Sequence, residues 1–138
     1  MRIVVDTNCL IASIPSKSEH FWLYRAFMAE AFEWVVSNEI LAEYEEQLAL
    51  FYSERTAHLV LNILSVAPNV IFAEPYFKWQ LIEKDADDNK FADLSISVGA
   101  EYLVSNDKHF NILKKIPFPK VNVVTIQQFR NVLGWDNL

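Results

Sequence analysis

The sequence predicts an α/β fold, a three-layer α/β/α sandwich around a central parallel sheet of four to five strands. Short apolar, β-branched runs alternate along the chain with segments of helical periodicity, the order that gives parallel strands covered by helices. The strand-like runs are apolar throughout rather than at every second position, as expected for strands buried on both faces. Only 2 glycines occur in 138 residues, which disfavours a turn-rich β-sandwich or barrel.

Taken in order, the strands are expected at residues 2–5, 34–36, 70–72, 102–104 and 121–124. Helices are expected at residues 7–13, 19–32, 39–51, 54–66, 88–99, 107–115 and 126–133. Side chains that favour helix N-caps precede three of them: Ser37 with Asn38, Ser53, and Thr125. Residues 75–86 are given no element. With no internal repeat or linker, residues 1–138 are expected to form a single domain.

The composition excludes several classes of function. The two glycines are far apart, so there is no glycine-rich phosphate loop. A single cysteine, Cys9, permits no internal disulfide, and the three histidines have no zinc-finger spacing, so an intracellular, cytoplasmic protein without structural zinc is expected. No stretch approaches the roughly 20 apolar residues of a membrane span, so no membrane association is expected.

The net charge of −6 lacks the basic signature of a nucleic-acid binder. Two explanations are compatible with such binding. A cluster of metal-binding carboxylates makes the formal net charge negative, although bound cations reverse the charge locally. Alternatively, an acidic protein can associate with a basic partner protein.

Two acidic residues directly follow predicted strands. Asp6 ends the first strand, and Asp107 follows the fourth strand after Ser105 and Asn106. In parallel sheets, ligands bind beyond the carboxyl ends of the strands, so both residues are candidate site residues. Aspartate is also a common helix N-cap, and each position alone is compatible with that structural role.

Asp88 lies on the inward stripe of its predicted helix, with Phe91, Ala92 and Ser95 three, four and seven residues further on. A buried carboxylate must be paired, hydrogen-bonded or metal-bound, although an N-terminal cap is the competing explanation. Asp93 lies roughly 140° away from this face and is left out on geometry.

Helix 39–51 is ambiguous. Its apolar stripe has Glu43 at one edge and Glu45 at the other, so periodicity does not choose between them and favours a solvated acidic face. Asp85 and Asp87, before the next helix, are also expected to be solvated.

The arrangement is more informative than any one residue. Four segments each direct a carboxylate towards one edge of the sheet, and gathering these charges without a cation would cost roughly several kcal/mol. Oxygen ligands without histidine or cysteine select Mg²⁺ or Mn²⁺.

The segments that carry these acids resemble the motifs of PIN domains. The opening strand and its Asp6, the glutamate motif 40–44, the segment 87–94 and the strand with acidic turn at 99–110 occur in the family's order and spacing. The resemblance runs from residue 2 to about residue 126. It implies a divalent-metal ribonuclease whose acidic quartet is Asp6, Glu43, Asp88 and Asp107. Ser105 stands where many members carry threonine. Asp93 matches an acidic position of some relatives, which implies that it is a possible fifth residue of the metal site.

The branch that the chain resembles most is the VapC-type toxins, which implies an antitoxin partner and a homodimer. In the implied chemistry, Asp6 and Asp107 bind metal directly, and Asp88 binds metal or orients water. Glu43 binds a second ion or accepts a proton from water. Asn8 and Ser105 hold the carboxylates in place.

Trp22 and Tyr76 are candidates for stacking on unpaired bases of single-stranded or looped RNA, although most aromatics in such a chain belong to the core. Trp79 and Trp135 hint at a partner surface.

Two other functions are compatible with the residues. One is a non-catalytic module of the same fold that acts through a partner protein. The other is a phosphatase with an aspartyl nucleophile at Asp6, although Asn8 stands where that chemistry usually needs a second acid.

Overall fold

The computed structural model describes residues 1–135, in which five strands form one parallel sheet. The strands are β1 (Arg2–Val5), β2 (Glu33–Val36), β3 (Val70–Phe72), β4 (Tyr102–Val104) and β5 (Val123–Val124). Their order in the sheet is β3-β2-β1-β4-β5. The predicted α/β class and the predicted parallel sheet are therefore confirmed.

The helices follow the predicted order. They are α1 (Thr7–Ser13), α2 (Phe21–Met28), α3 (Asn38–Phe51), α4 (Glu54–Val66), α5 (Asn89–Val98) and α6 (Ile126–Leu133), with the 3₁₀ helices η1 (Ala86–Asp88) and η2 (Lys108–Lys115). The hydroxyls of Ser37, Ser53 and Thr125 accept hydrogen bonds from the first turns of α3, α4 and α6, as the sequence predicts.

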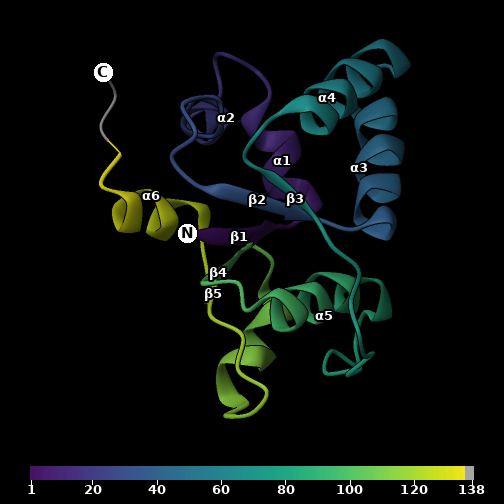
Figure 1. The fold of residues 1–138 in the computed structure, drawn as a ribbon, viewed down its shortest axis with the longest axis vertical. Coiled ribbons are helices and arrows are strands. Elements are labelled where there is room, and N and C mark those ends of the chain that lie inside the picture. Colours follow the sequence, from purple (N-terminus) through teal and green to yellow (C-terminus); the bar gives the residue numbers. More distant parts are fainter. Residues whose placement is uncertain (136–138) are drawn as a thin grey trace.

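The strand order reverses at β1. From β1 the chain runs outwards through β2 to β3 and then returns through α5 to β4 on the other side of β1. Helices α1 to α4 pack on one another, whereas α5 packs on β1 and β4 (Figure 1). The carboxyl ends of β1 and β4 therefore flank the point of reversal, where open α/β sheets bind ligands.

The core is centred on β1 and its neighbour β2. Ile3, Val4 and Val5 of β1 are fully buried, as are Val35 and Val36 of β2. Burying side chains of this size contributes about 1.5–3 kcal/mol each. This burial on both faces explains why the strand runs are apolar throughout.

Tyr44 fixes α3 to the end of β1. Its hydroxyl donates to the carbonyl of Val5 and accepts from Trp34 Nε1 at 3.2 Å, and its side chain is fully buried. Because Glu43 precedes Tyr44 in the same helix, this anchor also sets where the Glu43 backbone lies relative to Asp6.

Three predicted boundaries are wrong. The helix expected at 19–32 is shorter, since α2 ends at Met28 and the chain then turns through Glu30, whose φ is 58°, to enter β2. The strand expected at 121–124 pairs only at Val123 and Val124. Asp88 ends η1 instead of lying within α5, which begins one residue later.

Residues 73–85 have no helix or strand and wrap around α5 (Figure 1). The backbone amide of Tyr76 donates to Ser97 Oγ at 3.0 Å, and Asn89 exchanges two hydrogen bonds with the backbone of Ile82, at 2.9 and 3.0 Å. As a result α5 is buried on several faces.

Among residues 1–135, no helix has the length and apolar character required to cross a bilayer.

Candidate metal centre at the carboxyl edge of the sheet

Strands β1 and β4 end side by side, and the residues that follow them meet. Val5 pairs with Val104, so Asp6 and Asp107 emerge at the same edge. The Ser105 hydroxyl donates to Asp6 Oδ2 and accepts from the backbone amide of Asp107 at 3.0 Å. One serine therefore connects the two acidic segments.

Asp6 is both a helix cap and a buried site carboxylate. Its Oδ1 accepts from the backbone amide of Cys9 at 2.9 Å, while Oδ2 points to Ser105. Burial raises the pKa of Asp6, the hydrogen bonds from Ser105 and Cys9 oppose this shift, and the charge of Asp107 adds to it. Asp6 therefore acts as a helix N-cap and is also positioned as a candidate metal ligand, so the two explanations offered by the sequence are compatible.

The structure chooses Glu43 over Glu45. Glu45 is exposed, whereas Glu43 receives a hydrogen bond from Thr7 Oγ1 and lies 2.7 Å from Lys90 Nζ. The Lys90 side chain is 7% exposed, and its ammonium group also donates to the carbonyl of Asp87 at 2.7 Å. A buried ion pair thus holds Glu43 against α5.

Asp88 precedes α5 but does not cap it, because its side chain makes no hydrogen bond to the helix amides. Its Oδ2 atom is buried without a hydrogen-bond donor, and His109 Nδ1 lies 3.5 Å away. Burial first, and then the charges of Asp85 and Asp107, raise the pKa of Asp88 to about 6 against the opposing effect of His109.

Asp85 and His109 join this cluster although the sequence interpretation had placed neither there. His109 Nδ1 lies 3.6 Å from Asp107 Oδ1 and 4.0 Å from Asp85 Oδ2. Asp85, Asp88 and His109 each have one possible metal-ligand atom, a carboxylate oxygen or an imidazole nitrogen, and these three atoms lie within 4.8 Å of one another. The Asp85 side chain is 43% exposed, so it is solvated as expected, but it also lines the acidic cavity. Its spacing of three residues from Asp88 is the signal that places both on one helical face.

One acidic cavity of ≈ 170 Å³ gathers these groups. The carboxylates that line it are Asp6, Glu43, Asp85, Asp87, Asp88 and Asp107. In the described residues, the basic side chains within 4.0 Å of these carboxylates are Lys90 and the imidazole of His109. A lining with six carboxylates and a buried, unpartnered oxygen on Asp88 fits a divalent cation with hard oxygen ligands, such as Mg²⁺ or Mn²⁺.

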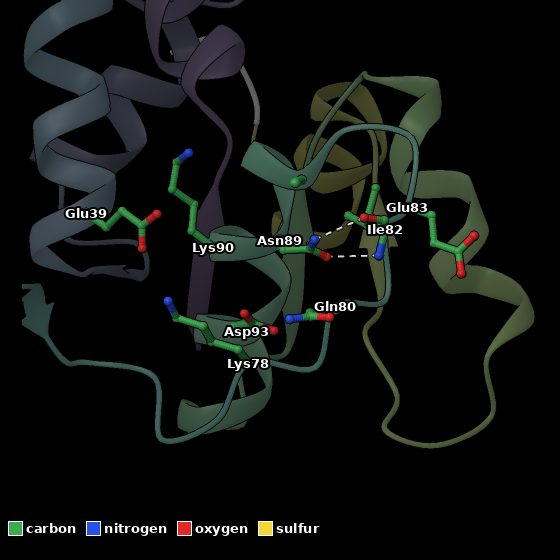
Figure 2. Close-up of a pocket in the computed structure, with 9 residues that line it drawn as sticks. Glu39, Lys78, Gln80, Ile82, Glu83, Asn89, Lys90 and Asp93 are labelled. Atoms are coloured by element: carbon green, nitrogen blue, oxygen red, sulfur yellow. Dashed lines mark hydrogen bonds between the residues drawn. The ribbon is translucent and has the colours of Figure 1, made fainter.

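Asp93 lies elsewhere, as helix geometry predicts. It is 5% exposed and accepts from the backbone amide of Trp79 at 3.1 Å. It lines a second cavity of ≈ 440 Å³, where it lies near Lys78 and Gln80 (Figure 2). Burial raises the pKa of Asp93. Asp93 is not among the residues that line the acidic cavity.

Asn8 and Trp22 are not placed as expected, whereas Tyr76 is exposed. Asn8 lies at the rim of the acidic cavity, and within residues 1–135 its side chain makes no hydrogen bond; the neighbouring Thr7 hydroxyl donates to Glu43 instead. Trp22 is 3% exposed and packs on Phe129, so the suggestion that it stacks on bases is wrong. Tyr76 is 90% exposed.

Comparisons with known proteins agree with this architecture. The model of the PIN domain family matches residues 2–109. The structure resembles VapBC2 from Rickettsia felis, solved bound to a promoter DNA fragment, with TM-score 0.63 and 18% identity over 99% of this chain and 100% of that one. It also resembles VapC20 of Mycobacterium tuberculosis, described as a toxin that cleaves the sarcin–ricin loop (TM-score 0.58, 17% identity, 79% and 92% covered).

A third similar structure is FitAcB from Neisseria gonorrhoeae, with TM-score 0.57 and 16% identity over 91% of this chain and 98% of that one. A search of curated proteins finds no match.

Proposed function

Because this chain belongs to the PIN-domain family, we propose that it is a metal-dependent endoribonuclease whose site is formed by Asp6, Glu43, Asp88 and Asp107. The observation that carries the proposal is that carboxylates from four separate segments line one small cavity, with a buried oxygen of Asp88 left without a donor. Such an arrangement is costly without a cation, and costly arrangements of this kind are concentrated at functional sites.

Mg²⁺ or Mn²⁺ would be held by the four carboxylates, where it would lower the pKa of water and stabilise the charge that develops on the phosphate. Asp6 and Asp107 are suited to direct binding, because Ser105 fixes both segments and leaves the remaining carboxylate lone pairs free.

Asp88 and Glu43 are suited to different tasks. Both oxygens of Glu43 are already engaged, by Thr7 and by Lys90, which supports a fixed electrostatic role over proton transfer. Asp88 has a buried Oδ2 atom without a hydrogen-bond donor, so this oxygen is available to a cation or to a water molecule bound to it. We therefore assign to Asp88 the binding of metal or the orientation of the attacking water.

We further propose that the protein is the toxin of a toxin–antitoxin pair. The similar structures from Rickettsia felis and Haemophilus influenzae are described as VapBC assemblies. Exposed apolar side chains on the C-terminal half of α3 and on α4 offer a surface for a partner: Leu50 at 72%, Phe51 at 62%, Leu59 at 54% and Val66 at 80% exposure. A homodimer is the second assembly we propose, and light scattering on the purified chain tests it.

The experiment that tests the nuclease uses a mixed single-stranded RNA pool with Mn²⁺, Mg²⁺ or EDTA. Asp6→Asn and Asp88→Asn are expected to lower cleavage at least about 100-fold, a loss typical of removing a group that stabilises the transition state. Glu46→Gln is the matched control, because Glu46 is an exposed acid on the same helix as Glu43.

If the folded protein with added metal cuts no RNA, or if the two aspartate variants cut as fast as the control, the nuclease proposal fails. The non-catalytic module acting through a partner protein then becomes the better explanation.

A further inference from the structure

The charges of this acidic protein are strongly divided along the chain. Residues 1–107 carry 17 acidic and 7 basic residues, a net charge of −10. Residues 108–135 carry five basic residues and no acidic one, a net charge of +5. The overall value of −6 therefore conceals a basic C-terminal quarter.

Most of this positive charge lies in one exposed segment. Lys108, Lys114, Lys115 and Lys120 are all exposed, and none forms an ion pair with a residue of the described chain. Lys114, Lys115 and Lys120 line one open cavity of ≈ 580 Å³ beside β5. Three unpaired ammonium groups around one hollow make a site that attracts anions.

An exposed aromatic group includes a residue from the same segment as the lysines. Phe118, between Lys115 and Lys120 in the sequence, is 80% exposed, and its ring centroid lies 6.3 Å from that of Trp79. Phe77 is 59% exposed, and its ring centroid lies 4.8 Å from that of Trp79. Exposed rings beside lysines match the requirements of an unpaired nucleic-acid strand, whose bases stack while its phosphates contact the cations.

The segment begins at the acidic cavity. Asp107 caps η2, whose eight residues span roughly 16 Å at the rise of a 3₁₀ helix before the chain reaches Ile116. In Figure 1 this part of the chain lies below β4 and β5, beside α5. A strand that has a phosphate at the acidic cavity is thus within reach of the lysines.

We propose that Lys114, Lys115, Lys120 and Phe118 form a binding surface for single-stranded RNA. This surface holds the strand at the end of η2 opposite Asp107. The choice of RNA as occupant rests on the proposed nuclease function. The binding itself requires no metal, because it uses only side chains outside the acidic cavity.

The test measures binding of fluorescein-labelled single-stranded oligouridine by anisotropy, in EDTA, over a series of salt concentrations. If each lysine neutralises one phosphate, the double variant Lys114→Gln/Lys115→Gln should reduce the slope of log K against log salt by roughly 1.4. At 0.1 M salt this corresponds to roughly 25-fold weaker binding. Lys17→Gln/Arg55→Gln changes the net charge equally on exposed residues elsewhere and is the control.

Phe118→Ala tests the stacking component and should weaken binding roughly 5-fold or more without changing the slope. Phe72→Ala, an exposed aromatic at the opposite sheet edge, is its control. Circular dichroism and thermal melting of each variant show that the fold is kept.

The two proposals fail separately. If the lysine and control variants lose equal affinity, or if wild type binds an acidic peptide but not the oligonucleotide, the binding surface is refuted even where RNA is cleaved. If binding follows the lysines but no metal-dependent cleavage occurs, the surface stands and the nuclease proposal fails.

Discussion

Replacing Asp88 by asparagine is expected to stabilise the metal-free protein at neutral pH. In the native state Asp88 is largely buried, has an oxygen without a donor and faces Asp85 and Asp107. Its ionised form is therefore disfavoured, which is why its pKa is raised to about 6 from an ordinary 3.8. The unfolded chain has no such penalty. Asparagine keeps the shape of the side chain and removes the charge.

The size of the effect follows from this difference in pKa. A shift of one unit corresponds to about 1.4 kcal/mol, so two units give nearly 3 kcal/mol, which we reduce to about 2 kcal/mol because 16% of the side chain still contacts water. Between about pH 4 and pH 6 the native protein binds more protons at Asp88 than the unfolded chain does. The free energy of unfolding therefore falls as the pH rises through this window and is flat above it.

Urea unfolding of wild type and Asp88→Asn in EDTA, from pH 4 to pH 7.5, measures this quantity. Comparing the two proteins cancels the contributions of other carboxylates, including Asp6 and Asp93. The variant should be about 2 kcal/mol more stable at pH 7 and equal to wild type near pH 4. Asp87→Asn, an exposed neighbour, should show no such dependence. If Asp88→Asn is less stable than wild type by the same amount at every pH, the reasoning is refuted.

Three further predictions concern the groups around this carboxylate. Tyr44→Phe removes the hydroxyl that joins α3 to β1 and Trp34, and should cost about 1–3 kcal/mol in urea unfolding; an unchanged midpoint would contradict the anchoring role. Lys90→Met and Glu43→Gln should each destabilise the protein, and the double variant should lose at least about 1 kcal/mol less than their sum, since the partners are in contact. Manganese should raise the melting temperature of wild type, and Ser105→Ala should weaken this binding about 10-fold, measured by titration calorimetry. Equal affinities would show that the serine does not support the metal ligands.

Several features of the fold could be predicted because they depend on short segments of chain. Ser37, Ser53 and Thr125 cap helices because their hydroxyls satisfy amides only a few residues away. Strands β1 and β2 were recognisable because burial on both faces makes every residue after their first one apolar. Asp6 and Asp107 were found because strand ends in a parallel sheet meet at one edge.

The choice of Glu43 over Glu45 shows where local patterns fail. Both glutamates lie at the edges of one apolar stripe, and their difference comes from Thr7 on α1 and Lys90 on α5, which are distant in the sequence. The resemblance to the PIN family singled out Glu43. The physical reason lies in the packing of α1, α3 and α5, which brings Thr7 and Lys90 to this glutamate.

Lys90 and Asp93 are buried although neither belongs to the inward stripe recognised in the sequence, because periodicity assumes that a helix buries one face. Helix α5 is buried on several, since β1 and β4 cover one side and residues 73–85 wrap the other.

The sequence by itself therefore determined the parallel α/β architecture, the helix starts and the two acids at strand ends, because each depends on burial or hydrogen bonding within a few residues. The tertiary structure decided which carboxylates share a cavity, which basic groups pair with them, and that Phe118 packs on Trp79. These properties depend on distances between segments far apart in the chain, which no sequence spacing records.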